Sequence, residues 1–388
     1  MIKNKLYENI QNGGNMNQTF YDLIYLCRCA VNGTVPLKDR TDQMDLEQLY
    51  TAAKYHTLTG ITASALESAG IHNDKFRTAK EKASRKNIFL DAERKKLFSF
   101  CEENGIWYMP LKGSVLKELY PDFSMRQMAD NDILFDAGYQ QKIKEYFESN
   151  GYQTVSCGKG NHDVYEKPPV LNFEMHTSLF GKSHDPKWFE YYGDVKKRLV
   201  KDSCNNYGYH FSDEDFYIYI ITHEYKHYSN SGTGIRSLLD CYVYLQAKQE
   251  TLNRTYIESE CEKLGISDFE KQSRELAGKV FGKSDAELTD EDKLMLESYL
   301  NSGTYGTLKQ SIEKSMEKFS QKTGSRSKLR YIMSRLFPGA EFFEAHYPPV
   351  FRHRIFLPAG WIYRICRGVV TNRKRIMNEL GIILNRKQ

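Results

Sequence analysis

Apolar residues recur at helical spacing along the first part of the chain. The stretches at 18–31, 45–70 and 73–105 place hydrophobic side chains three or four residues apart, and the second ends at a glycine, as helices often do. The third stretch is also rich in charged residues. This pattern predicts an all-helical N-terminal module over residues 17–104.

The pattern of apolar positions changes after residue 104, where short runs replace the long helical stretches. Strands are predicted at 105–113, 130–136, 152–156 and 169–179. Alternation of apolar and polar residues is clearest in the last of these runs, and an amphipathic helix is predicted at 139–151. Strands and helices interleaved in so short a segment predict a small mixed sheet with helices packed on it, over residues 105–185.

Helical spacing returns from residue 212 and continues to about residue 335, ahead of a basic amphipathic tail at 353–388. Residues 186–388 are therefore predicted to form a C-terminal helical region. The tail has two interpretations. The favoured one is a terminal helix packed through Trp361, Ile362 and Ile365, and the other is a surface for nucleic acid or a membrane. The predicted fold class is α+β, with a small mixed-sheet core flanked by N-terminal and C-terminal helical regions.

The composition is that of a globular protein. Of the 388 residues, 40% are hydrophobic and 27% are charged, and the net charge of +5 permits an anionic ligand without indicating nucleic acid. The eight cysteines include no Cys-x-x-Cys pair, so we expect reduced thiols rather than a disulfide framework or a zinc ribbon. No signal peptide or transmembrane stretch is recognisable, so we expect a cytoplasmic protein.

Two carboxylates stand out in the predicted strand at 130–136. Asp130 and Asp132 lie two residues apart, so their side chains leave the same face of a strand. They repel each other unless a cation lies between them, and one or two Mg2+ ions are the usual solution. Glu174, on the polar face of the strand at 169–179, is a natural third carboxylate. The alternative interpretations are a solvated Asp-Asn-Asp turn and an edge strand with one wet face.

A candidate phosphate site precedes these carboxylates. Gly113 and Ser114 lie between a predicted strand and a predicted helix, where exposed amides at the positive end of the helix dipole can hold a phosphate. A phosphate site with three converging carboxylates suits in-line phosphoryl or nucleotidyl transfer. Lys112 and Arg126 would offset the phosphate charge, although Lys112 can also cap a strand end and Arg126 can pair with a surface acid.

In this order, these residues resemble the DNA polymerase β-type nucleotidyltransferase superfamily. Its signature is a Gly-Ser at a helix start, then a carboxylate-x-carboxylate strand, then a third carboxylate on a later strand. More narrowly, the chain looks like the bacterial group of uncharacterised nucleotidyltransferases, with AbiEii-like relatives. The narrower resemblance is carried by Lys112-Gly113, Leu119-Tyr120-Pro121, Arg126, Glu174-Met175-His176, His223 with Lys226-His227, Arg236-Ser237-Leu238-Leu239-Asp240, 302–306 and 357–365.

Two features depart from the superfamily pattern. Fifteen residues separate Ser114 from Asp130, slightly more than is usual, and Asn131 stands between the aspartates where an apolar residue is usual. Both concern the local geometry of the strand rather than the carboxylates themselves.

The resemblance implies transfer of a nucleoside monophosphate from an NTP to an acceptor, with release of pyrophosphate. By resemblance, Asp130 and Asp132 hold two Mg2+ ions, for which Mn2+ can substitute. Glu174 ligates the metal that activates the acceptor hydroxyl, or takes its proton. Amides at Gly113 and Ser114 bind the β- and γ-phosphates. The expected partners are an NTP and an unidentified small-molecule, peptide or protein acceptor, and nucleic acid also stays open.

Polar residues on later elements are candidate contacts to the phosphates or to the acceptor. They are His176, His223, Lys226, His227, Arg236 and Asp240. The alternative is a polar contact between helices around Asp240. Two other functions also stay open: a non-catalytic member of the same fold that binds a nucleotide or a partner, and phosphoryl transfer on the same scaffold.

The segment at 223–227, His-Glu-Tyr-Lys-His, also matches the His-Glu-x-x-His spacing of zinc metalloproteases. The residues before it predict a helix, so His223 and His227 share a face. The extended zinc pattern requires a glycine and then a third histidine, and this chain has Asn230 and Thr233 in those places. A zinc metalloprotease is therefore a remote alternative.

Overall fold

The computed structural model describes residues 15–181, 184–304, 306–340, 342–343, 347 and 354–385. The chain divides into two compact units. The first comprises residues 1–225 and 234–300, and the second comprises residues 226–233 and 301–388. Over the described ranges, no helix combines the length and the apolar character needed to cross a bilayer.

The first unit begins with helices, as the apolar spacing predicts. They are α2 (Asn15–Val31), α3 (Lys38–Thr41), α4 (Leu46–Tyr55), α5 (Thr59–Ser68) and α6 (Asp74–Glu103). The predicted helix at 45–70 is two helices, because Thr57 between them adopts a positive φ of 58° that a helix cannot contain. The long helix α6 starts where Asn73 accepts hydrogen bonds from the amides of Lys75 and Phe76.

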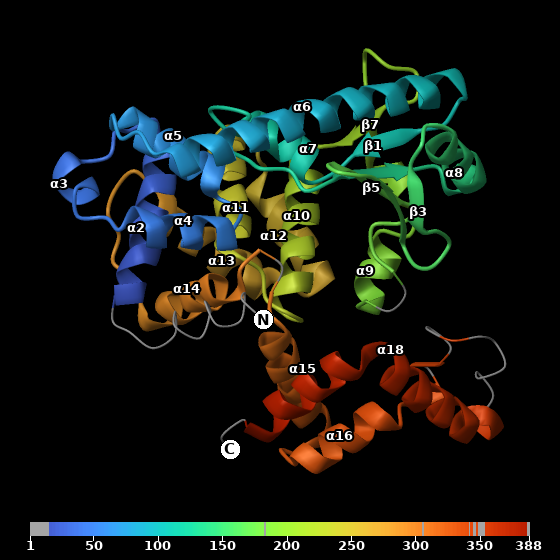
Figure 1. The fold of residues 1–388 in the computed structure, drawn as a ribbon. Helices are drawn as coiled ribbons and strands as arrows, with labels where there is room; N and C mark the ends of the chain where they lie inside the picture. The colour runs from blue at the N-terminus through green and yellow to red at the C-terminus, as the bar shows by residue number, and fades with distance from the viewer. Residues whose placement is uncertain are drawn as a thin grey trace. The chain divides into compact units, whose positions relative to one another are not determined.

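A five-stranded mixed sheet follows, and with it the predicted α+β class is confirmed (Figure 1). The strands are β1 (Tyr108–Pro110), β2 (Asn131–Phe135), β3 (Gln153–Ser156), β4 (His162–Lys167) and β5 (Leu171–His176), in the order β1-β2-β5-β4-β3. Strands β2 and β5 are parallel, and the other neighbours are antiparallel. The sequence pattern does not predict β4, since four of its six residues are polar.

The two faces of the sheet differ in character. Alternate residues of β2 and β5, such as Ile133 and Phe173, pack with α6 and with α8 (Gln140–Ser149) in one buried hydrophobic cluster. Their neighbours, including Asp132 and Glu174, leave the opposite face, since successive side chains of a strand alternate. The polar site is thus set on the face that α6 and α8 do not cover.

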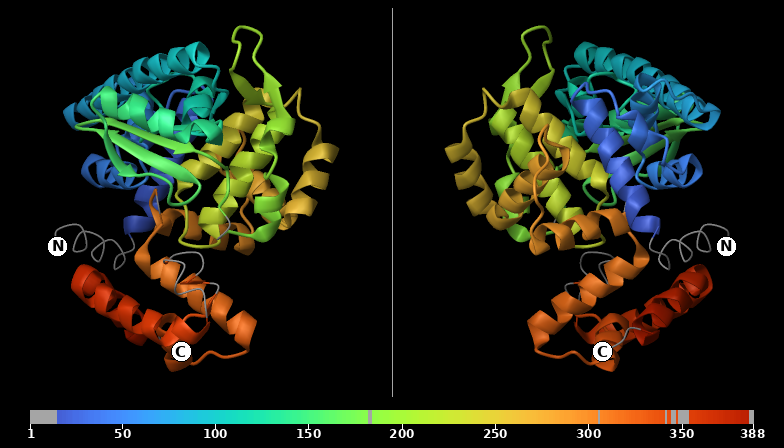
Figure 2. Two further views of the ribbon diagram at one scale, coloured as in Figure 1. Left: turned by 90° about the vertical axis from the view of Figure 1, so that its right-hand side faces the viewer. Right: turned by 90° about the vertical axis from the view of Figure 1, so that its left-hand side faces the viewer.

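Shorter elements link the strands to one another and the sheet to the later helices of the first unit. They are α7 (Gly113–Leu116), η1 (Lys117–Leu119), η2 (Ala137–Tyr139), α9 (Pro186–Tyr191), η3 (Val195–Arg198), β6 (Leu199–Lys201) and β7 (Tyr209–Phe211). Strands β6 and β7 form a hairpin that extends beyond the five-stranded sheet (Figure 2). The helices that follow are α10 (Asp213–Tyr228), α11 (Ile235–Lys248), α12 (Arg254–Leu264), α13 (Ser267–Phe281) and α14 (Asp290–Ser302).

The second unit is helical and has its own small core. Its main elements are α15 (Leu308–Thr323), α16 (Lys328–Leu336), η5 (Arg354–Phe356) and α18 (Leu357–Asn385). Its buried hydrophobic cluster consists of Ile312, Met316, Tyr331 and Ile383. The three-part division predicted from the sequence, at residues 17–104, 105–185 and 186–388, stays a prediction.

Candidate active site

The centre of the site is a pair of carboxylates on adjacent parallel strands. Asp132 of β2 and Glu174 of β5 are register partners, and His176 follows two residues later on the same face of β5. One ligand atom from each of these three residues lies within 4.8 Å of those of the other two. The structure therefore brings together three of the residues that the sequence singled out.

Asp132 is buried, and two partners stabilise its negative charge. Its Oδ1 accepts a hydrogen bond of 2.6 Å from Lys112 Nζ and lies 2.9 Å from His176 Nε2. Burial favours the neutral acid, but the Lys112 ammonium and the bond to His176 outweigh it and hold the pKa of Asp132 well below its ordinary value. Burial lowers the pKa of His176 to about 4, so this imidazole is neutral at pH 7.

The negative charges of the other two carboxylates, Glu174 and Asp130, are only partly neutralised. Burial, and then repulsion from Asp132, raise the pKa of Glu174 to about 7 and that of Asp130 to about 6. Asp130 lies just before β2 and is not part of the three-residue group described above, but Lys112 and Arg236 lower its pKa electrostatically. One lysine amid three carboxylates leaves the site attractive to a further cation.

The turn before α7 is strained and tightly packed. Lys112 has a positive φ of 48°, which is uncommon for a residue with a side chain and directs its ammonium to Asp132. A Cβ at Gly113 would lie 2.5 Å from Arg126 Nη1 and 2.7 Å from Met128 Sδ, so a side chain here would have to displace these two groups. The buried Ser114 hydroxyl donates to the Leu111 carbonyl oxygen, which closes the turn.

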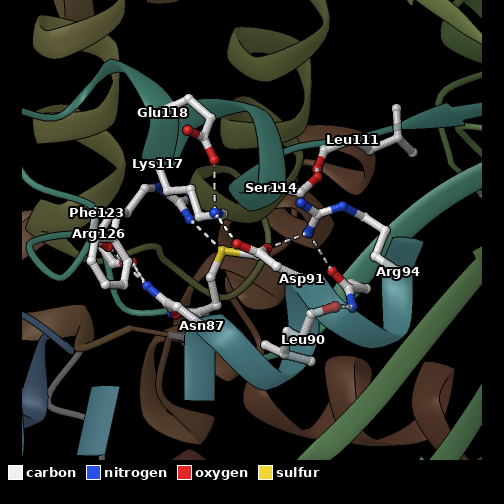
Figure 3. Close-up of polar contacts among 12 residues, drawn as sticks. Asn87, Leu90, Asp91, Arg94, Leu111, Ser114, Lys117, Glu118, Phe123 and Arg126 are labelled. Carbon is white, nitrogen blue, oxygen red and sulfur yellow. Dashed lines mark hydrogen bonds and ion pairs between the residues drawn. The ribbon is translucent and has the colours of Figure 1, made fainter. Parts of the chain in front are cut away.

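Helix α6 anchors the segment between the turn and the aspartates (Figure 3). The Asn87 amide donates to the carbonyl oxygens of Phe123 and Arg126. The buried ammonium of Lys117 lies 2.6 Å from Asp91 Oδ2. These contacts fix the long segment between Ser114 and Asp130.

Asn131, between the two aspartates, faces α6 rather than the site. Its side chain accepts a hydrogen bond of 2.9 Å from Arg94 Nη1 and donates one of 2.9 Å to the Leu90 carbonyl oxygen. It is fully buried. A polar residue is therefore accommodated where an apolar one is usual, because α6 satisfies both ends of its carboxamide.

Arg126 and Asp240 are buried against each other. Arg126 Nε and Nη2 donate to the two carboxylate oxygens of Asp240 at 2.7 and 2.8 Å, and the Tyr120 hydroxyl donates to Asp240 Oδ1 at 2.7 Å. The predicted phosphate-binding fork of Arg126 thus has a protein partner, while its Nη1 lies beneath Gly113. This arrangement is the polar contact between elements that the sequence left open for Asp240.

The predicted contacts on α10 and α11 are less tightly grouped. Arg236 lies near Asp130 and donates to the Gln127 carbonyl oxygen at 3.4 Å. His223 belongs to the first unit, whereas Lys226 and His227 belong to the second. The roles of His223, Lys226 and His227 stay predictions.

The glutamate of the His-Glu-x-x-His segment is turned into the core. Glu224 Oε1 accepts a hydrogen bond of 2.6 Å from the Tyr299 hydroxyl, and burial raises the pKa of Glu224 to about 8. In the described part of the chain, the one group of three side chains suited to a metal is that of Asp132, Glu174 and His176. The geometry therefore gives the zinc-protease alternative no support.

Two residues near the carboxylates are absent from the sequence prediction. Tyr219, buried on α10, interacts electrostatically with Lys112 and Asp132. It precedes His223 by four residues, so one helix face carries both, and that spacing was a usable signal. His162 lies opposite His176 in the register and 4.0 Å from Glu174 Oε2, but it is on the unpredicted strand β4.

The residues present fit a hard divalent cation. Carboxylate oxygens are the donors that Mg2+ and Mn2+ prefer, and Asp132, Glu174 and the adjacent Asp130 supply them. The raised pKa values of Glu174 and Asp130 are those of carboxylates whose charge is incompletely neutralised. A bound cation would remove that penalty.

The family of the chain follows from a comparison with models of protein families. A family model described as "Uncharacterised nucleotidyltransferase" matches residues 42–282, which include the whole sheet and Asp240. The crystal structure of an antigenic nucleotidyltransferase-like protein from Paracoccidioides brasiliensis is similar over 53% of this chain and 95% of that chain, with 14% sequence identity and a TM-score of 0.34. No curated protein matches the chain.

Proposed function

The chain belongs to a family of uncharacterised nucleotidyltransferases, and from this premise we propose that it transfers a nucleoside monophosphate from an NTP to an acceptor hydroxyl with release of pyrophosphate. The observation that carries the proposal is the pairing of Asp132 with Glu174 on parallel strands, beside Asp130. Membership of the polymerase β-type superfamily, the AbiEii-like relatives, a bacterial origin and a cytoplasmic location stay predictions.

Asp130, Asp132 and Glu174 would hold the cation, Mg2+ or Mn2+. When bound, such an ion neutralises charge on the phosphates and lowers the pKa of an oxygen that it ligates. The number of ions, predicted as two, stays a prediction.

The protein's own groups have separate tasks in this proposal. Glu174 has two alternative tasks: it would ligate the cation or, where it stays clear of the ion and keeps its pKa of about 7, accept the proton of the acceptor hydroxyl near neutral pH. Lys112 keeps Asp132 ionised and lies at the turn where the amides of Gly113 and Ser114 would bind the β- and γ-phosphates. Arg126, held by Asp240, would support that turn from below.

A non-catalytic nucleotide-binding role is the second candidate. The observation in its favour is that Lys112 and His176 already neutralise Asp132. Both bonds, however, are made to Oδ1 of that carboxylate. Asp132 also shares a side-chain hydrogen bond with Glu174 when that acid is protonated, and a cation bound between the two carboxylates would replace this proton.

The decisive experiment compares Asp132→Asn with the wild type. Calorimetry with each NTP and magnesium, followed by turnover of NTPs labelled separately at the α- and γ-phosphate, distinguishes nucleotidyl from phosphoryl transfer. Asp136→Asn is the matched control, because Asp136 follows the same strand but caps η2. We expect Asp132→Asn to abolish turnover with the fold intact.

Three results would count against the proposal. Unchanged turnover in Asp132→Asn would refute a catalytic Asp132. Collapse of the fold in that variant would make the aspartate structural. Metal-dependent NTP binding without any turnover would favour the non-catalytic candidate.

A further inference from the structure

The C-terminal part of the chain concentrates its positive charge. Residues 301–388 contain 17 Lys and Arg against 5 Asp and Glu, a formal charge of +12. Residues 1–300 contain 38 against 45, a formal charge of −7. The carboxylates of the proposed active site lie in the first unit, whereas the excess positive charge lies in the C-terminal part of the chain.

Apolar side chains form a solvent-facing stripe along α18. The stripe consists of Ile362, Val369, Val370, Met377 and Leu384, and all five are exposed, Val370 by 83%. Ile362 and Val369 are seven residues apart before the kink at Asn372, and Met377 and Leu384 are seven residues apart after it. Seven residues are close to two helical turns, so the residues of each pair lie on the same side of the helix. Exposed apolar groups arranged in this way mark a binding surface rather than chance exposure.

Helix α16 repeats the pattern. Leu329, Met333 and Leu336 are exposed and follow each other at intervals of four and three residues, which places them on one side of this helix as well. The second unit therefore presents apolar side chains from two of its helices.

Other side chains of α18 hold the second unit together. Ile383 packs with Met316 and Tyr331 in the buried cluster, and the Trp361 indole donates to the Pro338 carbonyl oxygen at 2.9 Å. Of the packing predicted for the tail, the half-buried Trp361 conforms, whereas Ile362 is exposed and that prediction is wrong. The exposed stripe is thus additional to the core of the unit.

Basic residues border the stripe. Arg367, Arg373 and Lys374 are exposed, and Arg373 lies between Val370 and Met377 on the apolar side itself. We propose that this surface, the apolar stripe with its basic border, docks onto an anionic lipid bilayer. The helix would lie in the plane of the interface, with apolar side chains in the acyl boundary and arginines and lysines against lipid phosphates.

The charge favours a bilayer over a second copy of the chain. Seven-residue intervals also occur in coiled-coil seams. In such a pair, however, Arg373 and Lys374 would face a partner whose residues 301–388 carry the same +12, which like-charge repulsion opposes. An anionic membrane supplies the complementary charge and the apolar phase together.

Vesicle flotation of the full chain tests this proposal. The probes are vesicles of phosphatidylcholine alone and vesicles with about one phosphatidylserine in four lipids. The variant is Ile362→Asp/Val370→Asp, and the matched control is Leu294→Asp, since Leu294 is 68% exposed on α14 of the first unit. Circular dichroism of each variant verifies that the fold is kept.

We expect the wild type to float with the anionic vesicles and not with the neutral ones, and to release as salt is raised. The double variant should partition roughly tenfold or more weakly, and the control should match the wild type. Binding of the double variant at wild-type strength, or no vesicle binding at all, overturns the proposal. A wild-type dimer that the double variant disrupts, without vesicle binding, assigns the surface to a second copy instead. The proposal is independent of nucleotidyl transfer, and NTP turnover in the double variant should be unchanged.

Discussion

Replacing Asp240 with alanine should destabilise the first unit strongly. The carboxylate accepts three hydrogen bonds, two from Arg126 and one from the Tyr120 hydroxyl, all between 2.7 and 2.8 Å. Arg126 is only 7% exposed, so the variant would leave its guanidinium charged, buried and without its partner. Breaking a buried ion pair in this way costs about 3–5 kcal/mol of unfolding free energy.

A second variant tests whether Arg126 and Asp240 stabilise the fold as a pair or serve as contacts to the substrate. Arg126→Met/Asp240→Leu removes both charges and keeps apolar volume, so most of the lost stability should return. If Arg126 instead served chiefly to bind the triphosphate, the single variant Asp240→Ala would leave stability near the wild-type value. NTP affinity would then change without any change in unfolding.

Urea denaturation in a Trp361→Phe background reports on the first unit, because Trp107 and Trp188 then supply the fluorescence. The control is Glu81→Ala, which breaks an exposed ion pair with Arg85 on α6 and should cost about 0.3–0.5 kcal/mol. A loss below about 1 kcal/mol in Asp240→Ala would refute the reasoning, since surface pairs cost that little.

Three further predictions follow from the site. The pKa values of Glu174 and Asp130, about 7 and about 6, lie above the ordinary carboxyl range. The protonated forms of these two groups therefore stabilise the metal-free protein fully below about pH 4, and this stabilisation is lost as the pH rises through 6 to 7. Magnesium should raise the melting temperature at pH 8 and much less at pH 5, and equal shifts at the two pH values would argue against ligation by these groups. Glu224→Gln should leave NTP turnover unchanged, because the glutamate is buried with a pKa of about 8 and is already neutral at pH 7; a large loss of turnover would show that its carboxylate takes part in the reaction. Gly113→Ala should weaken NTP binding in calorimetry and cost about 1–3 kcal/mol in denaturation, because the new Cβ would lie 2.5 Å from Arg126 Nη1; wild-type values in both would show that the turn tolerates a side chain.

Local periodicity was sufficient to predict the strands that carry the carboxylates. Alternation in β5 separates Phe173 and Met175, which enter the core, from Glu174 and His176, which face the site. The same logic failed for β4, because a strand that is largely polar and follows a glycine-rich loop has no apolar period to read. Its pairing with β5 is a property of the assembled sheet, and His162 was missed with it.

Pairings between distant residues were beyond any pattern in the sequence. Arg126 and Asp240 are 114 positions apart, and only the fold shows that they neutralise each other. Tyr219 lies on α10, and only the fold brings it near enough to Lys112 and Asp132 to interact with them electrostatically. Spacing identifies which residues share a face of one element, but not which face of another element meets it.

Asn131 shows how the helical and sheet parts of the first unit depend on each other. Because Asp130 and Asp132 must leave one face of the strand, the residue between them must point to the other, where α6 packs. An apolar side chain would bury itself there without specific partners, whereas the carboxamide requires Arg94 and the Leu90 carbonyl at fixed positions. The place of Asp132 is therefore tied to a helix that the sequence assigned to a separate module. A boundary at residue 104 divides α6 from the very strand that it holds in place.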